Sequence, residues 1–384
     1  MASTNLSRRD FSRSLAQSLA VACAAAPALA ASHAALADAG PGAATAGPVR
    51  INYNENPYGP SPRARRALAD SGSIAGRYPM AARDEIVAAL AKKHGVTPDN
   101  IAIGCGSTEI LRVADNAFLD PSKNVVAAEP TFEAVLDYAG VLHANPVKIP
   151  LTADHRHDLP RMAAACTSKT GVVYICNPNN PTGTIVTRDE VAAFIGGVSP
   201  STLILVDEAY FDFVEDARYS SATEFIAAHP NVVVARTFSK IYGLAGMRLG
   251  YAIAEKQVIA RLAAQTVQDN ANAAVLSAAQ ASLDDRLSLN DTRRKLNGTR
   301  DWLFAQFAKD GRSFIPSHAN FFMIDMGSDV QPFIEQLSAR QVLVGRRFPS
   351  LPNFMRVSVG TQNEMETFLA ALRQIAPARS SRAA

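Results

Sequence analysis

The stretch TFSKIYGLAGMRLGY, residues 237–251, decides the fold of this chain. It follows the apolar run VVVA at 232–235, which predicts a buried strand. Two aliphatic hydroxyls, one lysine, one arginine and three glycines lie within it. Hydroxyls and an arginine around Lys240 suit a phosphorylated ligand that is held while the amine reacts. On spacing alone, a solvated lysine beside a glycine-rich turn is the open alternative.

Two further polar motifs also follow apolar runs. NPNNPTG at 177–183 comes after VVYIC, and DEAY at 207–210 comes after LILV. Open α/β sheets bind ligands where their buried parallel strands end. The three motifs therefore predict one ligand site at the carboxyl edge of a sheet.

Together, NPNNPTG, DEAY and SKIYGLAGMRLG resemble motifs of the fold-type I aminotransferases, which depend on pyridoxal 5′-phosphate (PLP). The similarity runs from about residue 51 to about residue 372 and is strongest to the histidinol-phosphate aminotransferase group. It implies an α/β fold: a mostly parallel sheet sandwiched by helices, with a smaller α+β domain. The repeated strand–helix order of the chain predicts the same large domain independently.

The chain has 384 residues, of which 48% are hydrophobic and 19% charged, so we expect two lobes. Four segments are expected: an export signal at 1–37, an N-terminal segment at 38–75 that packs with the small domain, a large PLP-binding domain at 76–275 and a small C-terminal domain at 276–384. Hydrophobic periodicity predicts helices at 62–69, 84–94, 132–141, 188–196, 255–264, 272–283, 289–309, 330–339 and 364–375, and one after residue 109 whose apolar residues run from 110 to 118. It predicts strands at 101–103, 125–128, 172–176, 203–206, 232–235, 251–254, 320–324, 342–344 and 355–359.

The N-terminus resembles a twin-arginine export signal. Ser7-Arg8-Arg9-Asp10-Phe11 precedes an Ala/Leu-rich stretch, and small residues at 35–37 fit a cleavage site before residue 38, with a second possible site at 28–30. A membrane anchor or an Ala-rich leader is the alternative. We expect a protein that is cytoplasmic before export and periplasmic or otherwise exported afterwards.

Charge and cysteine content exclude several classes of function. A net charge of +3 gives no reason to expect nucleic acid as a partner. Of the four cysteines, Cys23 lies in the expected signal, so the mature chain keeps Cys105, Cys166 and Cys176. Because three is an odd number and their spacing does not fit a metal site, we expect three buried thiols and no disulfide framework. His155 and His157 alternate in a polar turn, and we expect no metal site there.

The resemblance assigns the cofactor site residue by residue. It implies that Lys240 holds PLP as an aldimine and then acts as a base, that Asp207 faces the pyridine nitrogen, and that Tyr210 and Asn180 bind the ring hydroxyl oxygen. Phe132 is expected to stack on the ring. Small residues at a strand-to-helix junction present free N–H groups to an anion. The expected phosphate ligands are Gly106, Ser107, Thr108, Thr237, Ser239 and Arg248.

The resemblance also implies substrate residues and a partner chain. Arg356 matches the carboxylate-binding arginine, and Arg346 is preferred over Arg347 as a second substrate arginine. Asn56, in the segment 51–60 that looks like the substrate cover, is a third substrate residue. Tyr78 is expected to reach the cofactor phosphate of the neighbouring chain in a homodimer. The family's upstream tyrosine is missing at 46–49, which puts histidinol phosphate in doubt as the substrate.

The expected reaction moves an amino group between an amino acid or amine, histidinol-phosphate-like, and a 2-oxo acid. A decarboxylase or lyase on the same scaffold, similar to threonine-phosphate decarboxylase, is the alternative within PLP chemistry. A PLP-binding regulator is the alternative outside catalysis, but it would need a basic DNA-binding segment, and none precedes residue 51.

Overall fold

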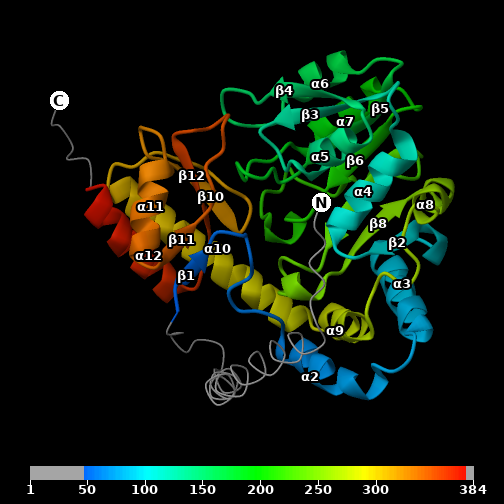
Figure 1. Cartoon of the computed structure of the whole chain (residues 1–384), viewed down its shortest axis with the longest axis horizontal. Helices are drawn as coiled ribbons and strands as arrows, with labels where there is room; N and C mark the ends of the chain where they lie inside the picture. Colours follow the sequence, from blue (N-terminus) through cyan, green and yellow to red (C-terminus); the bar gives the residue numbers. More distant parts are fainter. Residues whose placement is uncertain (1–46, 378–384) are drawn as a thin grey trace, which may run out of the picture. The chain divides into compact units, whose positions relative to one another are not determined.

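A seven-stranded sheet forms the centre of the structure (Figure 1). This computed structural model describes residues 47–377, and the predicted export signal lies outside them. The strand order is β2-β8-β7-β6-β5-β3-β4. Only β8 among these strands runs antiparallel to its neighbours, β2 and β7. The predicted mostly parallel α/β sheet is therefore confirmed. Its strands are β2 Ile101–Gly104, β3 Asn124–Glu129, β4 Asn145–Pro150, β5 Thr170–Cys176, β6 Leu203–Asp207, β7 Val232–Thr237 and β8 Gly250–Ala254.

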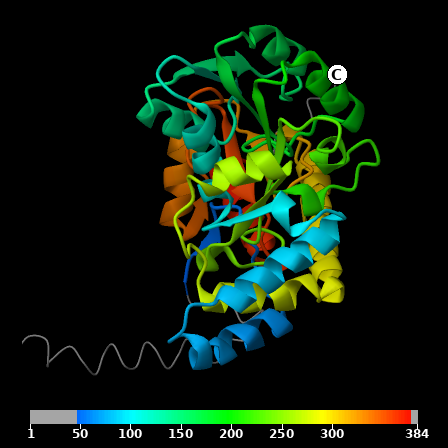
Figure 2. The same ribbon diagram turned by 90° about the vertical axis from the view of Figure 1, so that its right-hand side faces the viewer.

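The sheet is buried on both faces because its strands are apolar throughout. Every residue of β5, β6 and β7 is buried. The side-chain period of two sends Val173 and Ile175 to one hydrophobic cluster and Tyr174 and Cys176 to the other. Helices cover both faces, as Figures 1 and 2 show. α4 Ser107–Phe118, α5 Ala134–Val141 and α8 Lys256–Ala263 contribute to one cluster, and α3 Met80–His94, α6 Leu159–Ala165, α7 Arg188–Gly197 and α9 Ala273–Leu283 to the other.

Smaller sheets form from the two ends of the described chain. β9 Phe314–Ile315, β10 Phe321–Asp325 and β12 Phe354–Ser358 make an antiparallel sheet, and β1 Val49–Ile51 pairs in parallel with β11 Val342–Val344. α11 Gln331–Ala339 and α12 Gln362–Ile375 pack on these strands. α2 Pro62–Asp70 packs on α9, and the long helix α10 Arg286–Lys309 runs between α9 and α12 (Figure 1). Residues from Pro48 onward form one compact unit, and the boundary expected near 275 stays a prediction.

Two elements of the large sheet region were not predicted. β4 contains Pro146 and Pro150, and prolines usually indicate a turn. β4 is an edge strand that pairs only with β3, so a proline can lie there without breaking a hydrogen bond to a second neighbouring strand. α6 begins at Leu159, where the side chain of Asp158 accepts from the N–H of Arg161. Its seven residues are too few to show a clear helical period.

One prediction about the cysteines is wrong. Cys176 is buried at the end of β5, but Cys105 is exposed and Cys166 is only partly buried. Cys105 follows Ile103 and Gly104, the buried last residues of β2, and lies in the loop before α4. The chain leaves the sheet at this point, and the side chain of Cys105 faces outward. None of the described helices is long and apolar enough to span a membrane.

Candidate active site

The three motifs meet in one cavity at the carboxyl edge of the large sheet. The cavity has a volume of about 280 Å³. It brings together eleven of the fifteen predicted site residues, from segments up to 249 positions apart. These are Ser107, Thr108, Phe132, Asn180, Asp207, Tyr210, Thr237, Ser239, Lys240, Arg248 and Arg356.

Lys240 lies at the end of β7, and its amine faces this cavity. Its Nζ donates hydrogen bonds to the backbone oxygens of Asn54 at 3.1 Å and Tyr53 at 3.3 Å. Burial, and after it the nearby guanidinium of Arg356, lower the pKa of Lys240 to about 8. Roughly one tenth of this amine is therefore neutral at pH 7, far more than at the ordinary pKa of a lysine, as a nucleophile or base requires.

Asp207 ends β6 and is buried beneath the cavity. Its Oδ2 accepts from the hydroxyl of Tyr174 at 3.0 Å, and its Oδ1 accepts from the N–H of Ala209 at 3.1 Å. Burial raises the pKa of Asp207 to about 6, while these two hydrogen bonds and Lys240 act to lower it. The adjacent Glu208 does not line the cavity and forms a buried ion pair with Arg236 at 2.7 Å.

Tyr174 was missed by the sequence analysis. It lies on β5, one strand from Asp207, and its ring is fully buried. In the register of β5 and β6, Cys176 is opposite Asp207, so Tyr174 is the diagonal neighbour on the same face. The diagonal position of Tyr174 relative to Asp207 would have identified it as a contact of this carboxylate. Finding that position requires the register of β5 and β6, which the sequence does not give.

A cradle for a phosphate group lies at the start of α4. The first N–H groups of a helix have no acceptor within the helix. Gly106 precedes them with φ 77°, and a Cβ there would lie 2.2 Å from Nη2 of Arg248, so only glycine fits. Arg248 also donates to the hydroxyl of Ser239 at 3.3 Å. This set of N–H, hydroxyl and guanidinium donors fits the PLP phosphate.

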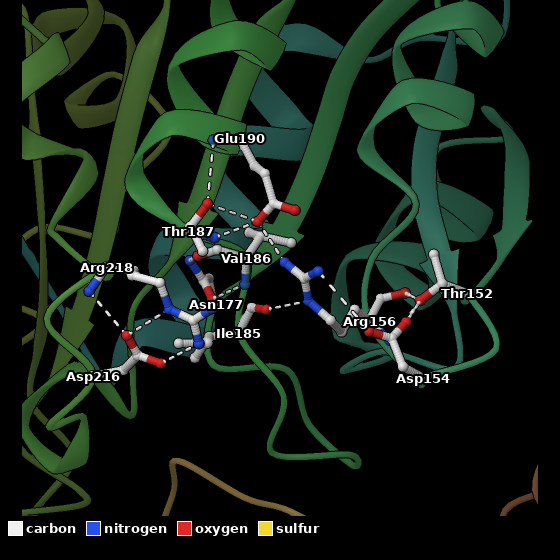
Figure 3. A network of polar contacts seen from close by, with 10 residues as sticks. All are labelled: Thr152, Asp154, Arg156, Asn177, Ile185, Val186, Thr187, Glu190, Asp216 and Arg218. Carbon is white, nitrogen blue, oxygen red and sulfur yellow. Dashed lines mark hydrogen bonds and ion pairs between the residues drawn. The ribbon is translucent and has the colours of Figure 1, made fainter.

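The loop 177–183 is fixed from behind by a polar network (Figure 3). The amide of Asn177 donates to the backbone oxygen of Val186 at 3.0 Å and accepts from its N–H at 3.1 Å. Arg156 donates to the oxygen of Ile185 at 2.8 Å and pairs with Glu190 at the start of α7. The network joins Asn177, at the start of the loop, to the segment that follows the loop, and Arg156 joins that segment to the first turn of α7.

Arg356 lies on β12 and connects the small sheet to the cavity. Its Nη1 donates to Oδ1 of Asn180 and its Nη2 to the backbone oxygen of Asn52, both at 2.8 Å. Its Nε is buried, and no hydrogen-bond partner for it lies among residues 47–377. No carboxylate of this part of the chain forms an ion pair with Arg356. Nη1 and Nη2 each have a second N–H beyond the bonds to Asn180 and Asn52, so the guanidinium retains donors for an anionic ligand.

The N-terminal segment lines the cavity with residues 53–55. Asn54, whose side chain was not singled out, donates from Nδ2 to the hydroxyl of Tyr210 at 3.2 Å. Asn56 instead donates to the backbone oxygen of Ile241 at 3.0 Å, and it lines a neighbouring cavity. Its predicted contact with substrate stays a prediction.

The remaining predicted residues lie around this cavity. Arg346 lines an adjoining cavity that shares Arg356, Asn180 and Phe132 with it. Arg347 is paired with Asp329 at 2.6 Å and lines neither cavity, which favours Arg346 as the second substrate arginine. Gly106 is in the phosphate cradle. Tyr78 is 80% exposed in the loop before α3 and does not line the cavity within its own chain.

Known proteins of similar sequence and structure fit this geometry. A sequence profile of the family described as aminotransferase class I and II matches residues 47–372. The chain is 39% identical over 330 residues to a histidinol-phosphate aminotransferase of Moorella thermoacetica, covering 85% of each chain. It is 38% identical over 336 residues to an aromatic amino acid aminotransferase of Rhodococcus jostii, covering 86% of this chain and 91% of that relative. A solved histidinol-phosphate aminotransferase from Sinorhizobium meliloti, in complex with pyridoxal-5′-phosphate, has a TM-score of 0.81 at 28% identity, covering 85% of this chain and 90% of that one.

Proposed function

Because this chain belongs to the class I and II aminotransferase family and is therefore a PLP-dependent transaminase, we propose that its amino donor carries a flat ring in the side chain and that a 2-oxo acid is the acceptor. The proposal rests on one observation: Lys240 and Arg356 line the same cavity, and the rings of Phe132 and Phe348 lie next to them. Arg356 offers a carboxylate site, and the rings offer flat apolar contact. The relatives named for histidinol phosphate and for aromatic amino acids also have ring-bearing donors.

PLP, when bound, supplies an electron sink for the bond that breaks at the substrate Cα. Lys240 is the residue that would move the proton at this carbon, because its Nζ faces the cavity and burial holds its pKa near 8. Arg356 would orient the substrate through its carboxylate. The contacts of Nζ with the backbone at 53 and 54 keep the amine at the mouth of the cavity.

Asp207 would hold the positive pyridine N–H of the cofactor. A buried carboxylate beside this group favours its protonated form, and the N–H in turn favours the ionised carboxylate. Tyr210 and Asn180 line the cavity where they would meet the ring oxygen, and the start of α4 with Arg248 would hold the phosphate. The cavity also excludes most water from Asp207, which is 3% exposed.

A single-turnover experiment tests the proposed donor class. The PLP-loaded enzyme is mixed with phenylalanine, tyrosine, histidinol phosphate or alanine, and the 2-oxo product is identified by mass spectrometry while the cofactor absorbance is followed. Ring-bearing donors should give the largest rate constant of the half-reaction per unit of donor concentration. Equal values for alanine would contradict the ring preference, and release of CO2 without a 2-oxo product would support the decarboxylase alternative.

We also propose that the enzyme is a homodimer in which Tyr78 completes the phosphate site of the neighbouring chain. Tyr78, Met80 and Ile74 expose large apolar side chains close together in the sequence, at 80%, 52% and 41%. Tyr78→Phe should weaken PLP binding about two- to tenfold, since it removes one hydroxyl hydrogen bond. Light scattering checks the dimer, and PLP titration checks the hydroxyl. A monomer with full PLP affinity would end this proposal.

Export by the twin-arginine route remains a proposal that rests on residues 7–11 and the Ala/Leu-rich stretch after them. Replacing Arg8 and Arg9 by lysine should keep the protein in the cytoplasm, because that route reads the arginine pair. Cell fractionation with a cytoplasmic marker measures the outcome. Unchanged export of the double variant would contradict the proposal.

A further inference from the structure

A second, larger cavity of about 570 Å³ adjoins the cavity next to Lys240. Arg356 and Asn180 belong to both. The second cavity also contains aromatic rings, one further arginine and two carboxylates on α5. This part is lined by Phe132, Phe348, Arg346, Glu133 and Asp137. A substrate whose carboxylate binds Arg356 would extend its side chain here.

Arg346 already has an anionic partner within its own chain. Its Nη2 forms an ion pair with the carboxylate of Glu133, 213 positions away in the sequence. Its guanidinium also lies over the ring of Phe348, 4.3 Å from the ring centre. Glu133 is the N-cap residue of α5, yet its side chain forms no capping hydrogen bond. The carboxylate is therefore directed at Arg346 rather than at its own helix.

We infer that Glu133 is a substitute anion that occupies Arg346 when the substrate side chain is uncharged and leaves it when the side chain carries a carboxylate or phosphate. The inference rests on the proposed function, because a transaminase binds its donor and its acceptor in turn at one site. A ring-bearing donor such as phenylalanine brings no anion for Arg346, whereas an acidic 2-oxo acid does. Glu133 would therefore allow Arg346 to face an uncharged donor side chain and an anionic acceptor side chain in turn.

The exposure of the pair supports an exchange of this kind. The side chains of Arg346 and Glu133 are 52% and 45% exposed. Ion pairs this exposed are weak, and each partner regains water when they separate. A substrate anion can therefore displace Glu133, but must compete with it. By contrast, Glu208 and Arg236 form a pair that is 1% and 6% exposed, and such a buried pair would not separate at low cost.

Equilibrium binding of two unreactive acids tests the inference. Glutarate carries a second carboxylate, and 3-phenylpropionate carries a ring in its place. Their dissociation constants are measured on the PLP-loaded enzyme by absorbance and on the apoprotein by calorimetry. Glu133→Gln removes the competing charge and keeps the shape. It should shift the ratio of the two affinities about two- to fivefold toward glutarate, the range expected when one exposed ion pair no longer competes with the ligand for Arg346.

Asp329→Asn is the matched control. Asp329 forms an ion pair at 2.6 Å with Arg347, which directly follows Arg346 in the sequence. Neither Asp329 nor Arg347 lines either of the two cavities. This variant makes the same change of charge and should leave the affinity ratio unchanged. In an Arg346→Gln background, Glu133→Gln should no longer shift the ratio, because the competition passes through Arg346.

An unchanged ratio in Glu133→Gln, or an equal shift in Asp329→Asn, would overturn the inference. A shift that persists without Arg346 would also overturn it. The proposed donor class is judged separately by the single-turnover products. Ring-bearing donors that react well while the ratio stays constant would leave the donor class intact and remove the role of Glu133. A shifted affinity ratio in an enzyme that prefers alanine would support the role of Glu133 and contradict the proposed donor class.

Discussion

Replacing Tyr174 by phenylalanine should weaken the site in a pH-dependent way. The change removes one hydroxyl and keeps the ring, which is fully buried. The lost contact is the hydrogen bond from the Tyr174 hydroxyl to Oδ2 of Asp207, at 3.0 Å. Because the carboxylate is 3% exposed, water cannot easily take the place of the hydroxyl. The variant therefore leaves an ionised oxygen short of one donor.

The size of the effect follows from the charge of the acceptor. A hydrogen bond to a charged group contributes about 1.5–3 kcal/mol, and one between neutral groups about 0.5–1.5 kcal/mol. The difference, about 1–1.5 kcal/mol, corresponds to a rise of about one unit in the pKa of Asp207, since each unit equals about 1.36 kcal/mol. Asp207 already has its pKa raised to about 6 by burial. The variant would thus leave much of Asp207 protonated at neutral pH.

The sign of the pH dependence is fixed by linkage. Because the folded-state pKa of Asp207 lies above its ordinary value of 3.8, the folded protein binds more protons than the unfolded chain between about pH 4 and pH 6. The stability that this group contributes is present at low pH and is lost as the pH rises through the folded-state pKa. In Tyr174→Phe this loss should extend about one pH unit higher. The variant should therefore be destabilised more at pH 8 than at pH 5.

The assay is denaturant unfolding of the apoprotein at pH 5 and pH 8, together with PLP titration at pH 7. Tyr219→Phe is the control, because the Tyr219 hydroxyl donates to the uncharged backbone oxygen of Asn177 at 2.7 Å. Its effect on the free energy of unfolding should be the same at both pH values. An equally constant effect for Tyr174→Phe, with unchanged PLP affinity, would refute the contact with an ionised Asp207.

Three further substitutions test the cofactor and substrate residues. Lys240→Ala should abolish turnover and the visible absorbance of bound PLP without changing the circular dichroism spectrum. In the wild-type apoprotein, the rate of PLP uptake should rise as the pH increases through about 8, because only the neutral amine of Lys240 reacts. Asp207→Asn should lower kcat by several orders of magnitude, and a rate within about threefold of wild type (~0.65 kcal/mol) would exclude it as the pyridine partner. Arg356→Lys should raise KM for a carboxylate substrate about tenfold or more, because an ammonium cannot bind both oxygens in a fork; an unchanged KM for every substrate would argue against carboxylate binding.

Much of the site could be predicted because its residues end strands. Lys240 follows β7 closely, and Asp207 ends β6, so a local apolar run was enough to place each at the carboxyl edge of a parallel sheet. The boundaries of most strands and helices followed from the same periodicity. β4 and α6 did not, because prolines and short length hide their period.

The contacts between residues distant in sequence could not be predicted in this way. Tyr174 is a sheet core residue by its pattern, and only the register of β5 and β6 brings its hydroxyl to Asp207. Glu133 is an ordinary helix start until the fold places Arg346 beside it.

The sequence by itself determined the sheet, its carboxyl edge and the motifs there, because hydrophobic period and turn chemistry act over a few neighbouring residues. Tertiary structure decided which arginine faces the cavity that contains Arg356: Arg346 lines it, while the adjacent Arg347 pairs with Asp329 outside it. Two neighbouring arginines have the same chemistry and almost the same local sequence. Only the backbone direction after β11 and the acidic partners that the fold supplies assign them different roles.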